Sequence, residues 1–478
     1  MDKDFLIASE FLTLLDTEQR WFTLAEIEKK LGVSDKTISK ISEGISKQLP
    51  SGIKIEVSRG KGIFLQRDRR SKTVSEVISN MFKQTTFFRL MDLLFTDGGR
   101  FTLEELAEVM FMSSSSLKKC IIQLNNHVLK PYNLRITYSS PSMKGNEINI
   151  RYFYWKLYCD AYEFAGWPFS KINFDVINQL ISNIEEEKNI VYFINSKRRL
   201  SFLVAIVLER VNKGESVTIS ERNYPWKQGM FYLPVTNLAK KLQQMFAIEL
   251  SQSEIFFMQS LFSTSQYNYY DHSIMVKVKE AERGKNKVEY QMVDRFLSLL
   301  LEVYPNLNMN ERFLWEIDEF FDKLLIDNAI PELMLNSNNN LITYVQKECQ
   351  QNYQEVQICL QEWNTAYPAV TYNDFHLTKL TLLVSSSLHY KSKKAFLVIG
   401  EEFSIQHYVA KLIKKEIGDE LIINTSIMKG LTDEIVQQHK IDFVISNIPV
   451  TLKTVPVVII STIPTKRDFD NIRKELLL

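Results

Sequence analysis

The sequence predicts a multidomain, mostly α-helical protein with two N-terminal winged-helix or helix-turn-helix domains, two all-helical domains and a C-terminal α/β domain. Three observations predict this fold class: a helix-turn-helix pattern that occurs twice, a middle region of long amphipathic runs, and a last segment of short apolar strands alternating with helices. The chain has 478 residues, 45% of them apolar and 24% charged, which suits about three to five globular domains.

Residues 22–66 have the pattern of a winged helix. Thr23 and Glu26 have capping-box spacing at the start of one helix, and a glycine ends that helix. Ser34 is the expected N-cap of a second helix, which turns three isoleucines toward the core, namely Ile38, Ile41 and Ile45. An amphipathic helix at residues 4–17 is expected to pack beneath both.

The second of these helices is expected to lie in the major groove of double-stranded promoter DNA. The outward side chains of its first turns are polar or basic: Lys36, Thr37, Ser39 and Lys40. The following residues predict a hairpin wing with Arg59 and Lys61 at its tip, against flanking phosphates. Residues 36–72 hold ten Lys or Arg against three acids, whereas the whole chain nets only +1. This local excess favours contact with a polyanion.

The N-terminal pattern is repeated once along the chain. Residues 101–106, FTLEEL, repeat residues 22–27, FTLAEI, at an offset of 79 residues, and Ser113 falls where the N-cap serine of the first unit does. The repeat predicts two helix-turn-helix domains, at residues 1–70 and 71–160.

The second unit offers its own polar helix turn. Ser115 and Lys118 could bind a DNA half-site or only phosphates, so we expect this unit to be auxiliary. A hairpin is expected after this helix, with strands at residues 134–138 and 147–150.

The remainder of the chain divides by its hydrophobic pattern. Long amphipathic runs predict two helical domains, at residues 161–275 and 276–392. Residues 393–478 predict a mainly parallel sheet covered by helices, with strands at 395–399, 421–425, 442–446 and 455–461. One helix of this last domain carries an apolar face that we expect to serve a two-fold homodimer: Ile405, Tyr408, Val409, Leu412 and Ile413.

Composition and motifs exclude several classes of protein. The N-terminus is amphipathic and acidic, unlike a signal peptide, and no apolar run reaches the length of a bilayer, so a cytoplasmic protein without a membrane partner is expected. The four cysteines lack CxxC spacing, which excludes a zinc site of that type. The absence of a P-loop or a GxSxG motif predicts a non-enzymatic protein without cofactor or metal.

Three strings resemble the Mga/AtxA family of virulence transcription regulators of Gram-positive bacteria: RWFTLAEIEKKLGVSDKTISK, RGKGIFL and VISNIPVTLKTVPVVIISTIPTKRDF. The resemblance spans essentially the whole chain, and the last string is the most specific of the three. It implies that the middle domains are phosphotransferase-system (PTS) regulation domains, in which a PTS phosphocarrier protein phosphorylates histidines. It also implies an EIIB-like last domain used for homodimer formation, and an activator rather than a repressor.

The sequence departs from the family at the positions that carry phosphate. Arg198 stands where the first regulation domain is expected to have its histidine. In the second domain one register places Ser386 at that position, and the other leaves His389 as the phosphorylation candidate. The loop at residues 400–404 lacks the cysteine that an active EIIB domain carries after its first strand.

Two other functions compete with a promoter-binding regulator. A transcriptional antiterminator shares the regulation domains but binds RNA through a small β-domain, whereas this N-terminus is helical. A PTS phosphotransfer component would need the cysteine that is missing here.

Overall fold

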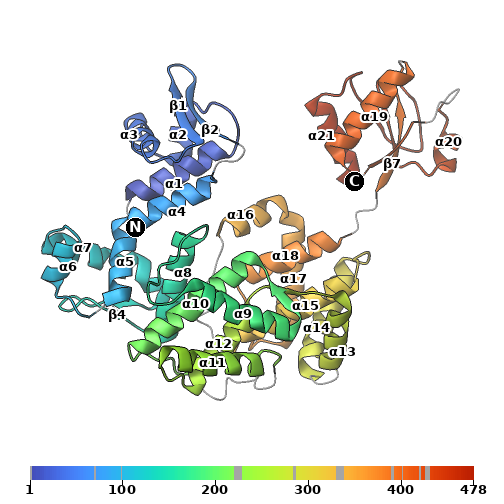
Figure 1. Cartoon of the computed structure of the whole chain (residues 1–478). Coiled ribbons are helices and arrows are strands. Elements are labelled where there is room, and N and C mark those ends of the chain that lie inside the picture. Colours follow the sequence, from blue (N-terminus) through green and yellow to red (C-terminus); the bar gives the residue numbers. More distant parts are fainter. Residues whose placement is uncertain are drawn as a thin grey trace. The chain divides into compact units, whose positions relative to one another are not determined.

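The computed structural model describes residues 3–68, 72–97, 99–219, 229–283, 287–329, 339–388, 392–400, 402–418, 421–425 and 431–477 (Figure 1). The chain forms two compact units. The larger consists of Met1–Leu299 with Leu314–Leu382, and the smaller of Leu300–Phe313 with Leu383–Leu478. The predicted mostly helical fold is confirmed, and so is the parallel sheet near the C-terminus.

The N-terminal part of the larger unit folds as three helices followed by a two-stranded antiparallel wing. These elements are α1 (Lys3–Asp16), α2 (Leu24–Leu31), α3 (Asp35–Ser46), β1 (Ile53–Ser58) and β2 (Gly62–Arg67). Their apolar faces share one core that includes Phe11, Phe22 and Ile27. The periodicity of the sequence therefore places these elements correctly, because each apolar stripe meets the same core.

Gly62 allows the wing to pack against the chain just before α2. Phe22 and Ile63 exchange two backbone hydrogen bonds of 2.8 Å each. Gly62 has a φ of +102°, and a Cβ there would lie 2.0 Å from the Phe22 carbonyl oxygen. Glycine alone tolerates both conditions, so it fixes the wing beside α2.

Helices and a short hairpin make up the second helix-turn-helix region. They are α4 (Val74–Gln84), α5 (Thr86–Asp97), α6 (Leu103–Val109), α7 (Ser114–Leu124), β3 (Arg135–Ile136), β4 (Met143–Lys144) and α8 (Glu147–Tyr162). The predicted strand at residues 147–150 is wrong, because these residues begin α8. The Asn146 side chain caps that helix by accepting from the Ile148 N–H at 2.8 Å, and Glu147 pairs with Arg151 one turn later.

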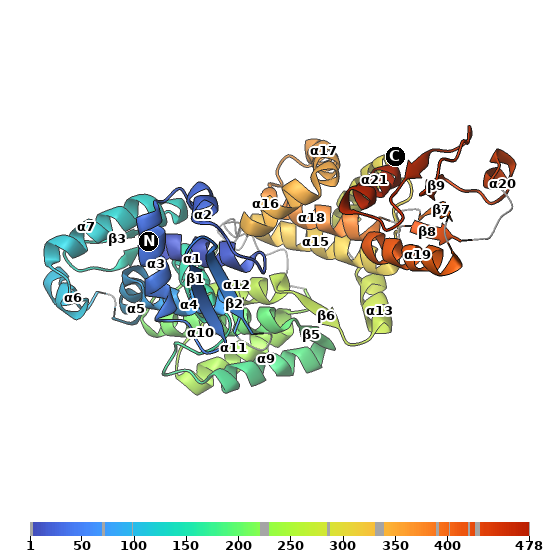
Figure 2. The same cartoon turned by 90° about the horizontal axis from the view of Figure 1, so that it is seen from above.

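The middle of the chain is helical, as predicted. Its helices are α9 (Phe174–Lys188), α10 (Ile194–Asn212), α11 (Tyr232–Phe246), α12 (Gln252–Thr264), α13 (His272–Arg283), α14 (Lys287–Val303), α15 (Glu311–Ala329), α16 (Asn339–Glu348), α17 (Gln350–Ala366) and α18 (Asp374–Ser387). The sequence did not predict the antiparallel pair β5 (Ile190–Tyr192) and β6 (Tyr267–Tyr269), visible in Figure 2. Each strand is only three residues long, too short to show a period.

One hydrophobic core joins the second helix-turn-helix region to the first helical region. It runs through buried residues from Phe82 to Met275 and includes α8, α10 and α12. Inside it, Arg151 of α8 and Glu254 of α12 form a fully buried ion pair. The two regions therefore pack as one body around α8.

The C-terminal domain is a four-stranded sheet in the order β10-β9-β7-β8, with every neighbouring pair parallel. Its strands are β7 (Lys393–Val398), β8 (Leu421–Asn424), β9 (Phe443–Ser446) and β10 (Val457–Ile459). Helices α19 (Phe403–Ile417) and α21 (Lys466–Leu477) pack on one face, and α20 (Asp433–Gln438) packs on the other.

The predicted dimer face of α19 needs correction. Val409 and Ile413 are fully buried in the core of their own domain, where they cover β7. Tyr408 remains exposed. The five apolar positions thus do not form one free face, because a helix that covers a sheet uses its apolar stripe for that sheet.

None of the helices in the described segments combines the length and the apolar character that a bilayer crossing requires. The same segments contain no group of three or more His, Cys, Asp or Glu side chains that could hold a metal ion.

Candidate functional site

The first turns of α3 present most of the predicted DNA contacts to solvent. Lys36, Ser39 and Lys40 are exposed, and the two lysines have no ion-pair partner among the described residues. Thr37 is half-buried, and its hydroxyl lies 3.1 Å from that of Ser34. Three of the four predicted residues are therefore free to meet a ligand, while Thr37 also supports the helix start.

A carboxylate from α2 fixes the entry into α3. The Asp35 N–H donates to Glu28 Oε1 at 2.6 Å, whereas Ser34 occupies the N-cap without capping by its side chain. This bond satisfies one of the open N–H groups of the first turn. The same bond ties the start of α3 to α2. A helix that is inserted into a DNA groove needs such a fixed orientation relative to its neighbour.

The predicted wing is present, and its two cations differ in their surroundings. Arg59 and Lys61 are exposed in the turn between β1 and β2. The Lys61 Nζ lies 5.8 Å from the centroid of the Trp21 ring, within the range of a cation–π contact. Arg59 has no ion pair within the described part of the chain. Both charges can reach a phosphate, and Lys61 is additionally held toward the base of the wing.

The two helix-turn-helix units share the same capping geometry. In each, the threonine N–H donates to the glutamate Oε2 at 2.8 Å, and the glutamate N–H donates to the threonine Oγ1 at 3.2 Å; the pairs are Thr23 with Glu26 and Thr102 with Glu105. The hydrogen bonds from the threonines hold the pKa of both glutamates below the ordinary value. The predicted repeat is confirmed at the level of individual hydrogen bonds.

Helix α7 presents the predicted polar and basic side chains of the second unit to solvent. Ser113 caps α7 by accepting from the Ser116 N–H at 3.2 Å, which leaves Ser115 and Lys118 exposed on its outer turns. Helix α7 contains no acidic residue. Ser115 and Lys118 are therefore accessible to a ligand, as Lys36 and Lys40 of α3 are.

A second pair of cations on the neighbouring hairpin was missed. Arg135 of β3 lies directly opposite Lys144 of β4, and both side chains are exposed. Like charges at opposed strand positions repel each other, and a phosphate between them would relieve that repulsion. The misplaced strand at residues 147–150 hid this pairing, although two cations flanking a turn are visible in the sequence.

Arg198, at the position where the resemblance implies a histidine, is already bonded. Its Nη2 donates to the carbonyl of Tyr162, the last residue of α8, at 2.8 Å and to the Gly166 carbonyl just beyond that helix at 2.6 Å. Burial lowers the pKa of this guanidinium. The Arg198 side chain thus joins α10 by hydrogen bonds to the end of α8 and to the residues that follow it.

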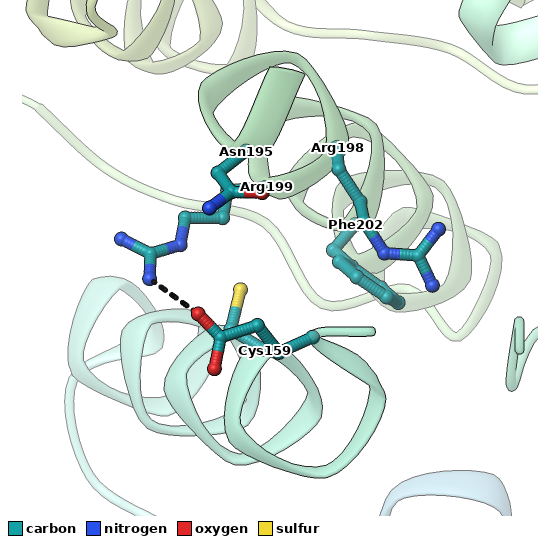
Figure 3. Close-up of a pocket in the computed structure, with 6 residues that line it drawn as sticks. Cys159, Asn195, Arg198, Arg199 and Phe202 are labelled. Carbon is teal, nitrogen blue, oxygen red and sulfur yellow. Dashed lines mark ion pairs between the residues drawn. The ribbon is translucent and has the colours of Figure 1, made fainter. Parts of the chain in front are cut away.

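A small pocket lies beside this link (Figure 3). It is lined by Cys159 and Glu163 from the end of α8 and by four residues of α10, Asn195, Arg198, Arg199 and Phe202. Figure 3 shows the Arg198 and Arg199 side chains pointing in opposite directions, and Arg199 Nη2 lies 3.6 Å from Glu163 Oε1. Burial raises the pKa of the Cys159 thiol, so this cysteine is not a reactive thiolate.

In the second helical region, His389 lies outside the described residues. Ser386 is exposed near the end of α18, and its hydroxyl donates to the Leu383 carbonyl at 2.9 Å. His376, which was not among the predicted site residues, lies on the same helix. This histidine is buried, its Nδ1 accepts from the Asn373 N–H at 3.2 Å, and its Nε2 lies 3.1 Å from Asp327 Oδ2. Both ring nitrogens are engaged, so His376 is a structural residue.

The loop after β7, where an EIIB domain carries its cysteine, is closed by side chains from other loops. The Gly400 N–H donates to Asn447 Oδ1 at 2.8 Å, and Asn447 Nδ2 donates to Thr462 Oγ1 at 3.1 Å. A Cβ on Gly400 would lie 2.8 Å from the Ile448 side chain. These contacts fill the crevice at the carboxyl ends of the strands, where ligands of α/β sheets bind.

Comparison with known proteins agrees with this architecture. Residues 70–158 match the Mga helix-turn-helix domain. Over 483 residues the chain is 28% identical to the capsule synthesis positive regulator AcpB of Bacillus anthracis, which covers 99% of this chain and 98% of that protein. Over nearly its whole length the chain is therefore similar to regulators of the Mga/AtxA family.

Two further members of the family match over nearly their full length. The capsule synthesis positive regulator AcpA of Bacillus anthracis is 26% identical, covering 98% of both chains. The anthrax toxin expression trans-acting positive regulator of the same organism is 25% identical, covering 99% of this chain and 98% of that protein. The Mga match lies on the second helix-turn-helix region, which contains Ser115, Lys118 and the Arg135–Lys144 pair.

Proposed function

We propose that this Mga/AtxA-family chain is a non-enzymatic transcriptional activator of virulence-type genes, which binds double-stranded promoter DNA as a homodimer. The observation that supports it best is the pair of helix-turn-helix units with equal capping geometry, each with an exposed basic reading helix and a cationic hairpin. Relatives that match over nearly the whole chain are named positive regulators.

The reading helices suggest limited base readout. Helix α3 exposes lysines and serine at its first turns but no Arg or Asn, the side chains that read base edges most specifically. We expect a preference for curved, A·T-rich promoter DNA, recognised by its shape. A genome-wide DNA-occupancy experiment tests the proposed function, and the absence of reproducible promoter sites would refute it.

Removing one cation from the first wing should weaken DNA binding equally at all sequences. Arg59→Ala and Lys61→Ala are each expected to reduce the slope of log affinity against log salt by about one unit, because each removes about one phosphate contact. Fluorescence anisotropy on a labelled duplex at several salt concentrations measures this slope. Lys47→Ala is the matched control, since Lys47 pairs with Glu43 at 3.0 Å near the other end of α3. Unchanged slopes for both wing variants would reject the wing as a DNA contact.

The two competing functions have less support. An RNA-binding antiterminator would need a small β-domain at the N-terminus, where α1 to α3 lie. A PTS phosphotransfer component would need a nucleophile after β7, where Asn447 fills the crevice. Titration with duplex DNA and with a stem-loop RNA of equal length separates the first alternative from our proposal.

Control by the phosphotransferase system is part of the proposal and rests on the resemblance at His389. His389→Ala is expected to abolish any sugar-dependent change in promoter output, because a phosphoryl group there would add one to two negative charges beside a basic stretch. A PTS phosphocarrier protein would be the partner. Reporter output with and without a PTS sugar, together with phosphopeptide mapping at neutral pH, provides the measurement. If His389 is unmodified and promoter output does not change in the His389→Ala variant, the register that places Ser386 at the family position is favoured. The protein would then have lost control by the phosphotransferase system.

A further inference from the structure

The outer surface of α6 carries acidic and apolar side chains, which the proposed DNA contacts do not involve. Helix α6 carries three glutamates and no basic residue, and Glu104 and Glu108 are exposed. Beside them Val109 is exposed, and Phe111 in the following turn is 88% exposed. In Figures 1 and 2, α6 lies at an outer edge of its unit, next to α7. The surface is therefore both acidic and apolar, and it is accessible.

The first helix-turn-helix unit allows the α6 surface to be compared with the equivalent surface of α2. At the offset of 79 residues, the corresponding positions of the first unit are Ala25, Lys29, Lys30 and Gly32. That surface is basic and has no large apolar side chain, whereas the α6 surface is acidic and aromatic. Since the two units share their fold and capping, the difference does not arise from the needs of the fold.

Phe111 is expected to lower the stability of its own domain. It has a φ of +55° at the position where Gly32 has +65°, and glycine adopts this conformation without a steric penalty. Its ring is almost fully exposed to water, and within the described residues it makes no aromatic contact. A residue that is unfavourable in both backbone and side chain contributes through something outside the domain.

The charges decide which class of partner fits. Glu104 and Glu108 would repel DNA phosphates, and the cations proposed to contact DNA, Lys118, Arg135 and Lys144, lie on α7 and on the β3–β4 hairpin. An exposed aromatic ring that follows a helix with exposed carboxylates suits a protein patch that is apolar and bordered by Lys or Arg. The surface is thus complementary to a protein and not to nucleic acid.

We infer that Glu104, Glu108, Val109 and Phe111 form a docking surface for a cation-bordered apolar patch on RNA polymerase at the same promoter. The inference rests on the proposed function, because it requires that the chain is bound to promoter DNA when it activates. The helix next to this surface, α7, reads DNA under that proposal, so a polymerase bound to adjacent DNA can reach α6.

The test replaces this surface by the residues of the first unit. The double variant Glu108→Lys with Phe111→Gly, in the full chain, is compared with wild type in transcription with purified RNA polymerase holoenzyme on a promoter fragment from the occupancy experiment. We expect stimulation to fall about tenfold, with DNA affinity not reduced. Thermal melting should be unchanged or higher, because glycine relieves the backbone at position 111.

Glu186→Lys is the control, because it reverses an exposed charge on α9 of the same unit and should leave stimulation unchanged. Full stimulation by the double variant would overturn the inference. So would a loss of DNA affinity, which would make Phe111 a DNA contact. Wild type that fails to bind the fragment would overturn the proposed function and the inference with it, whereas the first two results would leave the proposed function intact.

Discussion

Replacing Glu254 by Leu is expected to lower the free energy of unfolding by about 3–5 kcal/mol, because it removes the fully buried carboxylate that pairs with the Arg151 guanidinium and leaves Glu147 as the remaining acidic partner. The side chains of Arg151 and Glu254 are both fully buried. Arg151 Nη2 donates to Glu254 Oε1 at 2.8 Å, and the same oxygen accepts from the Val217 N–H at 2.8 Å. One substitution therefore breaks several hydrogen bonds between α8, α12 and the chain after α10.

Two further variants separate the charge effect from simple loss of packing. Arg151→Met together with Glu254→Leu should recover part of the lost stability, since no unpaired charge then remains in the core. The exposed pair Arg295–Glu362, at 3.3 Å, is the control, and Arg295→Met should cost less than about 1 kcal/mol. Urea unfolding followed by circular dichroism measures all three. A loss for Glu254→Leu no larger than that of the control would contradict the expected effect.

The position of this ion pair matters for the proposed function as well as for stability. Arg210 of α10 donates to Glu147 Oε2 at 2.6 Å, and Glu147 also accepts from Arg151. Lys213 donates to the Thr96 carbonyl at 2.9 Å, at the end of α5. These bonds connect the first helical region to both ends of the second helix-turn-helix region. Under the proposed function, a change within residues 161–275 would therefore reach α7 through the core that both regions share.

The sequence was sufficient for the elements whose signals are local. Capping boxes, the wing turn and the alternation of the C-terminal strands depend on neighbouring residues, and all of them are present. The sequence was not sufficient where a contact joins residues that are far apart along the chain. Glu254 bonds Arg151 across 103 positions, and charged residues are expected at the surface unless paired, so the pattern gave no sign of this contact.

The errors in the candidate site have similar causes. Ile148 and Ile150 alternate with polar residues as in a strand. The residues form a helix because the Asn146 cap and the Glu147–Arg151 ion pair stabilise its first turns. His376 was overlooked because its partner Asp327 lies on α15, 49 positions away. The strained Phe111 could have been found from the repeat, because it aligns with a glycine at a helix end.

The proposed homodimer should depend on the carboxyl edge of the C-terminal sheet. Since Val409 and Ile413 are buried, the exposed apolar side chains of this domain include Phe403 at the start of α19, Ile448 after β9 and Ile463 after β10. The hydrogen bonds of Asn447 to Gly400 and Thr462 hold these loops together. All three side chains are exposed, and we propose that they contribute to a two-fold contact between copies of the chain.

Phe403→Asp is therefore expected to weaken the dimer at least about tenfold, since it places a charge in an apolar interface. Phe403 is 59% exposed and begins α19, where an acidic side chain favours the helix dipole, so the domain itself should stay folded. Sedimentation velocity across a range of protein concentrations measures the shift from dimer to monomer. Ile358→Asp is the matched control, because Ile358 is an exposed isoleucine on α17 of the larger unit. If Phe403→Asp remains as fully dimeric as Ile358→Asp, the contact lies on another surface.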